Sequence, residues 1–160
     1  MAWTVRQVAV PPAARALSTL SHVGYEDGFL VDTGPAQDRT GEQWARLFLE
    51  DAPPVTRGAL VSGWSALGLQ LSSAGSDEYV LGWELLRNTP DVALLGADSR
   101  LGLRGEVLFM RRMNTLLFAT FVQHGNPVLR SVWAGVAPVH RQVVRNLLGR
   151  PSQAESTPSM

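Results

Sequence analysis

The clearest pattern in the chain is the succession of apolar and polar positions between residues 79 and 124. Four strand-like segments, 79–87, 91–98, 101–112 and 115–124, are joined by connections of only two or three residues. Connections this short join antiparallel neighbours, because a parallel pair needs a crossover of a dozen residues or more. The pattern therefore predicts an antiparallel meander.

The third of these segments indicates which side of the sheet is buried. Four apolar side chains share one side of its alternation: Leu101, Leu103, Val107 and Phe109. Four charged side chains share the other side: Arg100, Arg104, Glu106 and Arg112. Because successive side chains of a strand point to opposite faces, we expect the apolar set against a core and the charged set in water.

Two helices are predicted before the meander and one long helix after it. Thr40 and Gln43 match a capping box, and the prolines at 53 and 54 end this helix and open the second. Asn126 followed by Pro127 is typical of the start of the long helix. Its apolar stripe follows spacings of three and four: Leu129, Trp133, Val136, His140, Val143 and Leu147. Pro138 predicts a kink, because proline has no N–H to donate.

The remaining N-terminal part predicts a short strand within residues 1–10, a helical turn within 12–20 and a strand at 24–32. The order strand, helix pair, meander and long helix is typical of an α+β protein. It predicts a helix-grip fold, in which a curved antiparallel sheet wraps around a long C-terminal helix and leaves a cavity between them. We expect one such domain over residues 1–150 and a disordered, Ser/Pro-rich tail over 151–160.

Two groups of residues carry a resemblance to a known family. The first is a Tyr-x-Asp-x-Phe stretch formed by Tyr25, Asp27 and Phe29. The second lies in the last helix: Asn126, Arg130, Trp133, Pro138, His140 and Arg141. In these motifs the chain resembles a bacterial family of unknown function in the START-like, or polyketide-cyclase-like (SRPBCC), superfamily, from about residue 25 to 148. Glu26 and Gly28 stand where that family usually has small residues. The resemblance implies the helix-grip fold and no particular reaction.

Composition removes several kinds of chemistry. The chain contains no Cys, no Lys and no Ile, a bias that indicates GC-rich coding and a bacterial source. Without Lys there is no P-loop and no Schiff base with pyridoxal phosphate, and without Cys there is no thiol nucleophile or iron–sulfur cluster. The histidines, His22, His124 and His140, lack the spacing of a zinc site. No cofactor and no metal are expected.

Charge is unevenly distributed along a chain whose formal net charge is zero. Residues 1–98 carry 12 acidic residues and 6 Arg, whereas residues 99–160 carry 2 acidic residues and 8 Arg. Either the two halves interleave in space, so that their charges cancel, or the C-terminal half forms a basic face suited to an acidic ligand or partner. Because aromatic residues are not interleaved with the arginines, we expect no nucleic-acid binding.

Location follows from two negative observations on the sequence. No apolar run reaches the roughly 18 residues of a membrane span, and the first residues do not follow the pattern of a secretory signal. We therefore expect a cytoplasmic protein without a membrane span. Homo-oligomer formation is possible and is left open.

His140 is the most informative polar residue, because it falls on the apolar stripe of the last helix. As a core residue it would be hydrogen-bonded to backbone or to a carboxylate, whereas in a cavity it would orient a ligand or act as an acid or base. Asp27 is the first choice of partner and Asp98 the alternative. Trp83 and Trp133 either pack in the core or line the same cavity. The candidate ligand-binding residues are His140, Trp133, Trp83, Asp27 and Tyr25.

Three functional hypotheses follow. The favoured one is a cavity that binds a small hydrophobic or lipid-like molecule. The alternatives are a cofactor-independent enzyme of the cyclase or hydratase kind, with His140 as acid or base, and an interaction protein whose core is filled by its own side chains. A connected void of several hundred Å³ would favour the first two hypotheses over the third.

Overall fold

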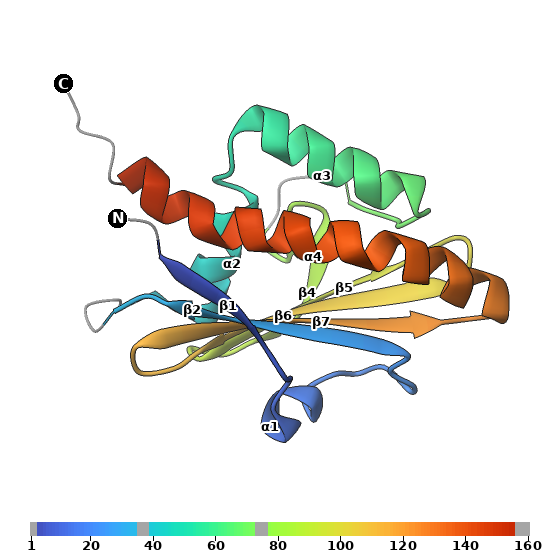
Figure 1. Cartoon of the computed structure of the whole chain (residues 1–160), viewed down its shortest axis with the longest axis horizontal. Coiled ribbons are helices and arrows are strands. Elements are labelled where there is room, and N and C mark those ends of the chain that lie inside the picture. The colour runs from blue at the N-terminus through green and yellow to red at the C-terminus, as the bar shows by residue number, and fades with distance from the viewer. Residues whose placement is uncertain (1–2, 35–38, 73–76, 156–160) are drawn as a thin grey trace.

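A computed structural model describes residues 3–34, 39–72 and 77–155 of the chain. Within these ranges the chain forms seven strands and four helices (Figure 1). The strands are β1 (Thr4–Val8), β2 (Tyr25–Asp32), β3 (Tyr79–Val80), β4 (Trp83–Asn88), β5 (Val92–Asp98), β6 (Leu103–Arg111) and β7 (Thr115–His124). The helices are α1 (Pro12–Arg15), α2 (Gly41–Leu49), α3 (Pro54–Ala66) and α4 (Pro127–Glu155).

The seven strands form one open antiparallel sheet in the order β1-β2-β7-β6-β5-β4-β3. Strands β3 to β7 follow one another as the meander that the short connections predict. β2 interrupts this order, because it pairs with β7 along its whole length, from Tyr25 opposite Val122 to Asp32 opposite Thr115. This pairing places β2 beside the last strand of the meander, beneath α4. The fold class is α+β, as the order of elements predicts.

Both faces of the sheet are covered, but unequally (Figure 1). Helices α2, α3 and α4 lie on one face, where Phe29, Trp44 and Phe109 belong to the larger core. The short α1 lies on the other face, over a smaller core that includes Leu94 and Phe121. The central strands are therefore buried on both sides, which a simple alternation of apolar and polar positions does not predict.

The side-chain register predicted for the third strand segment is confirmed in β6. Leu103 and Phe109 belong to the larger core, and Arg104 is exposed. The expectation for Leu101 was wrong, since this residue is 57% exposed. Gly102 has a φ of 98°, and the Ser99 N–H donates to the Leu103 carbonyl, so residues 99–102 form a turn and the strand begins later.

The first segment of the meander also differs from the sequence prediction. It consists of two strands, β3 and β4, separated by Leu81 and Gly82. Both turn residues have a positive φ, 48° and 92°, as in the two-residue hairpin turns that match the twist of antiparallel strands. The apolar run from 79 to 87 concealed this hairpin, because Leu81 is an unusual residue for a left-handed position.

Glu106 was expected in water, and this expectation was wrong. The side chain is fully buried in the face of the sheet that the segment after α1 covers. Its carboxylate accepts hydrogen bonds from the Ser18 hydroxyl at 2.6 Å, from the Thr19 N–H at 3.1 Å and from the Thr19 hydroxyl. Glu106 therefore fixes the connection between α1 and β2 to the centre of the sheet.

Helix α4 lies along the larger core and buries Leu129, Trp133 and Leu147, as predicted. Val143 was expected to be buried with them, but it is 40% exposed. It lies at the edge of the stripe that faces α3, and α3 does not close over this edge. The buried stripe is completed instead by three residues one position away: Ala137, Val144 and Leu148.

The helical conformation of α4 is continuous from Pro127 to Glu155, across Pro138. The bend expected at Pro138 stays a prediction. The helix continues beyond residue 150, and residues 156–160 of the expected tail lie outside the described residues, as do residues 1–2 of the first predicted strand. Among the helices of the described ranges, none combines the length and the apolar character needed to cross a membrane.

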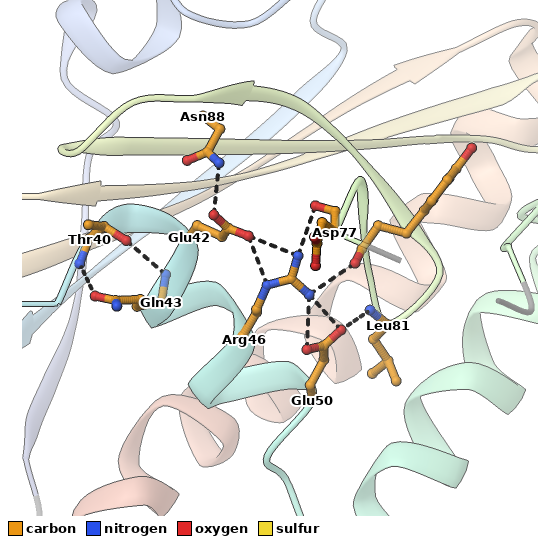
Figure 2. A network of polar contacts seen from close by, with 9 residues as sticks. Thr40, Glu42, Gln43, Arg46, Glu50, Asp77, Leu81 and Asn88 are labelled. Carbon is orange, nitrogen blue, oxygen red and sulfur yellow. Dashed lines mark hydrogen bonds and ion pairs between the residues drawn. The ribbon is translucent and has the colours of Figure 1, made fainter. Parts of the chain in front are cut away.

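Helix α2 is fixed at its start and at its middle (Figure 2). The predicted capping box is present, because the Thr40 hydroxyl accepts from the Gln43 N–H and the Gln43 side chain accepts from the Thr40 N–H. One turn later, Arg46 forms ion pairs with the helix residues Glu42 and Glu50.

The same guanidinium also reaches beyond the helix (Figure 2). Arg46 donates to the carbonyls of Asp77 at 3.0 Å and Tyr79 at 3.1 Å. Asp77 lies two residues before β3, and Tyr79 is its first residue. The network therefore ties the end of the long α3–β3 connection to α2, and it leaves α3 itself outside these contacts.

The burial of Glu106 gives a first testable prediction. Glu106→Gln should lower the free energy of unfolding by about 1–3 kcal/mol, because the amide has one acceptor oxygen fewer and adds a buried N–H₂ group. Glu84→Gln, at an exposed position of β4, is the matched control and should change it by less than about 0.5 kcal/mol. Urea unfolding of the three proteins measures both values. Equal stability of all three would contradict the structural role of Glu106.

Candidate functional site

A cavity of ≈ 350 Å³ lies between the sheet, α3 and α4. Strands β6 and β7 contribute Leu103, Val107 and Thr120 to its floor, and α4 contributes Trp133 and His140 to its roof. Apart from the indoles, Thr120 and His140 are the only polar side chains among the described residues that line it. The cavity is thus an apolar space with one polar corner.

Helix α3 forms the remaining wall and is loosely packed. Leu60 is the one side chain of α3 that is buried among the described residues. Figure 1 shows α3 beside α4 over the same face of the sheet. Five residues both line the cavity and are exposed to solvent: Ala59, Gly63 and Ala66 of α3, with Val139 and Val143 of α4. These five residues define the mouth of the cavity.

His140 enters the polar corner from α4 and is held there by the sheet. Its Nε2 atom lies 3.1 Å from Oδ2 of Asp27 and 3.2 Å from the Thr120 hydroxyl. Asp27 and Thr120 are directly opposite each other on β2 and β7. The predicted partner, Asp27, is confirmed, whereas Asp98 forms an exposed ion pair with Arg104. Because Nε2 is engaged, Nδ1 is the ring nitrogen that has no partner within the described residues.

Two further polar residues extend this contact. The Tyr25 hydroxyl donates to Oδ2 of Asp27 at 2.6 Å and accepts from Arg141 at 3.2 Å. Tyr25 and Asp27 are two residues apart on β2 and so point to the same face. Burial, together with the hydrogen bond to Asp27, raises the pKa of the Tyr25 hydroxyl above its usual value, and Arg141 opposes this rise only in part. Tyr25 therefore stays protonated and keeps donating to Asp27.

Aromatic rings lie around the polar corner and along another wall of the cavity. Trp133 packs 5.3 Å from the rings of both His140 and Tyr25, and Trp83 packs edge-on against Trp64 at 5.4 Å. All three tryptophans line the cavity. Trp83 and Trp133 are also almost fully buried, and their indole N–H groups have no hydrogen-bond partner in the described structure. Trp83 and Trp133 are therefore core residues and also part of the cavity wall, so core packing and lining of the cavity do not exclude each other.

The structure brings four of the five candidate residues into one cluster. His140, Trp133, Tyr25 and Asp27 are in contact, although they come from opposite ends of the chain. Trp83 lies apart from them, across the cavity. Asp27 and Tyr25 do not line the cavity but support His140 from behind.

Sequence reasoning missed three residues of the site. Thr120 looked like an ordinary strand residue, and only the β2–β7 register places it opposite Asp27. Arg141 was noted in a motif, but its contact with Tyr25 depends on where α4 crosses the sheet. Trp64 lies on the predicted apolar face of α3, and nothing in the sequence indicates that this face borders a cavity.

Comparisons with known proteins do not assign the chain to a family. It matches no protein-family model, no curated protein and no solved structure. Within the described ranges, no three His, Cys, Asp or Glu side chains gather as metal ligands. What the structure adds is that four residues of the two motifs, Tyr25, Asp27, His140 and Arg141, form one hydrogen-bonded cluster.

The contact between Asp27 and His140 gives a second prediction. In a double-mutant cycle of Asp27→Asn and His140→Phe, the two substitutions should be coupled by about 0.5–3 kcal/mol in the free energy of unfolding, because they remove the same buried interaction. A parallel cycle that pairs His140→Phe with Asp32→Asn, at the exposed end of β2, should show less than about 0.5 kcal/mol. Additive effects in both cycles would show that the two side chains are not partners.

Proposed function

We propose that this protein binds a small hydrophobic or lipid-like molecule in the cavity between the sheet, α3 and α4. The observation that carries the proposal is a connected space of ≈ 350 Å³ with apolar walls and a single polar corner. This volume falls within the range of ordinary ligand pockets, about 300–1,000 Å³. A protein whose own side chains fill its core would not leave such a space, which disfavours the third hypothesis.

The chemistry of the walls supports an apolar occupant. Water molecules in the cavity would find Thr120 and His140 as hydrogen-bond partners and little else. Ordered internal water needs two to four polar partners for each molecule. A ligand with an apolar body would instead gain contacts with the tryptophan and leucine side chains that line the space, and the polar corner would receive one polar group.

The supporting cluster is consistent with a functional site. Asp27 is a carboxylate with 1% of its side chain exposed, and its second oxygen has no hydrogen-bond partner in the described structure. Such a group is costly to bury, and apolar replacements of buried ion pairs often leave stability unchanged or increased. Stability alone therefore does not explain why Asp27 lies behind His140. A role of Asp27 in orienting His140 toward a ligand would explain this position.

We also propose that the architecture is a helix-grip fold of the START-like kind. Three features support this assignment. β2, which precedes α2 and α3, lies beside β7, the last strand of the meander. The long helix α4 covers the sheet, and a cavity lies between α4 and the sheet. The bonded cluster of motif residues is consistent with the resemblance in sequence.

Acid–base catalysis is the second candidate, and the Asp27–His140 contact favours it. A carboxylate that holds one nitrogen of an imidazole orients the ring and stabilises its protonated form, while the other nitrogen serves as proton acceptor or donor. In that role the protein would release a product different from the bound substrate. The product would be heavier by one water after a hydration and lighter by one water after a cyclising dehydration. His140→Phe would then retain the unaltered substrate, whereas a binding protein would hold the same molecule with and without His140.

The third prediction uses two glycines of α3. A Cβ added at either Gly63 or Gly58 meets no atom within 4 Å, and only Gly63 lines the cavity. Gly63→Leu should therefore place a side chain at the mouth and weaken binding of a fluorescent fatty acid such as cis-parinaric acid about tenfold or more, a loss of roughly 1.4 kcal/mol. Energy transfer from the tryptophans of the cavity measures the binding.

Gly58→Leu is the matched control for this experiment. Both substitutions replace a helical glycine and should stabilise α3 by up to about 1 kcal/mol. Gly58→Leu should bind the fatty acid like the wild type. Binding that is unaffected by Gly63→Leu, or lost equally in both variants, would place the fatty acid elsewhere, and a wild-type protein without binding would count against the proposed function.

A further inference from the structure

The polar corner of the cavity, formed by Thr120 and His140, offers a ligand few hydrogen-bonding atoms. Trp83 and Trp133 also line the cavity, but their indole nitrogens are buried, so a ligand does not reach them. Nδ1 of His140 has no partner within the described residues either, and it is not among the buried atoms. A ligand in the corner therefore meets this ring nitrogen and the Thr120 hydroxyl.

Asp27 decides which ring nitrogen of His140 carries the proton. In its neutral form an imidazole has one N–H and one lone pair. Nε2 lies 3.1 Å from Oδ2 of Asp27, an oxygen that already accepts from the Tyr25 hydroxyl. A lone pair on Nε2 would face the negative carboxylate, whereas an N–H at this position donates to it. The proton therefore lies on Nε2, and Nδ1 is a hydrogen-bond acceptor.

The Thr120 hydroxyl is a donor without an acceptor. Its one hydrogen-bond contact in the described structure is with Nε2 of His140, at 3.2 Å. Because Nε2 carries the proton, Thr120 can only accept in this contact, and its own hydrogen is not used. Thr120 is directly opposite Asp27 in the sheet, yet Oδ1 of Asp27 has no partner and so does not take this hydrogen. The corner thus presents one donor, on Thr120, beside one acceptor, on His140.

The lining of the cavity carries no formal charge. None of the described residues that line it is an Arg, an Asp or a Glu, and the chain contains no Lys. An anionic headgroup in the corner would face the lone pair of Nδ1, with the buried carboxylate of Asp27 behind the same ring. A protonated His140 would balance only one of these two negative charges. Burial of a charge without a partner is costly, so the corner favours a neutral group.

We propose that the cavity selects a neutral hydrophobic molecule that ends in a hydroxyl group. A hydroxyl accepts from Thr120 and donates to Nδ1 of His140 at the same time, whereas an ester, ether or ketone oxygen can only accept. This inference rests on the proposed function and names the polar end of the ligand: a lipid alcohol, rather than a fatty-acid anion or an ester. Thr120 is then the residue that determines specificity in the corner.

Three probes with the same fluorescent tetraene chain test this choice: cis-parinaryl alcohol, cis-parinaric acid and its methyl ester. At about pH 8 the acid is ionised in water. The wild type should bind the alcohol about tenfold more tightly than the ester, a difference of roughly 1.4 kcal/mol, because the ester cannot donate to Nδ1. It should also bind the alcohol about tenfold or more above the ionised acid, which buries a charge. Energy transfer from the tryptophans of the cavity measures all three affinities.

Thr120→Val separates the choice of polar group from the packing of the chain. This substitution removes the O–H donor, so the advantage of the alcohol over the ester should fall to about twofold or less, and the affinity for the ester should change by less than about twofold. Thr120→Ser keeps a hydroxyl and should retain the advantage. Thr115→Val, on the same strand but outside the lining of the cavity, is the matched control and should select probes like the wild type.

The outcomes distinguish this inference from the proposed function. A wild type that binds alcohol and ester equally, or binds the acid most tightly, would overturn the selection of a hydroxyl. The cavity would remain a ligand site in that case if Gly63→Leu weakens binding of the probes. An advantage of the alcohol that persists undiminished in Thr120→Val would overturn the role of Thr120. Absence of binding for all three probes would contradict the proposed function, and this inference with it.

Discussion

The position of α4 over the sheet depends on one buried carboxylate. Asp27 lies on β2, beneath the helix, where its side chain is 1% exposed and water cannot solvate it. Its donors are Tyr25 from its own strand and His140 from α4. A contact of 3.1 Å between sheet and helix limits how far α4 can move at this point, and Arg141 reinforces it one residue later through Tyr25. This contact lies at the polar corner of the cavity, where His140 and Thr120 line it.

The wall of the cavity on the opposite side, formed by α3, is held by fewer contacts. Helix α3 buries only Leu60 and contributes small residues to the mouth, while the Arg46 network fixes α2 and the start of β3 and bypasses α3. One wall of the cavity is thus tightly held and the other is lightly attached. Helices with few buried contacts open at low free-energy cost, and this is the side on which the exposed Val139 and Val143 line the mouth of the cavity.

Much of the fold could be predicted from local signals. The capping box at Thr40 and the short connections of the meander depend on neighbours in the sequence, and both are present. The alternation in β6 also placed Leu103 and Phe109 correctly in the larger core. The partner of His140 also followed, because helical periodicity aimed the ring at the sheet. Features that depend on which elements cover a face could not be predicted. Glu106 is buried because the segment after α1 folds over its side of the sheet, and Val143 is exposed because α3 stays away from it.

The function proposed for this protein requires that the cavity holds a hydrophobic molecule in the cell. Native mass spectrometry of the full chain, purified from its own host without detergent, tests this most directly. We expect a second species heavier than the chain by the mass of one small molecule, which dissociates on activation and is absent or reduced in Gly63→Leu but not in Gly58→Leu. A wild-type protein that shows only the mass of the bare chain, under conditions that retain lipids in a known lipid-binding protein, would contradict it.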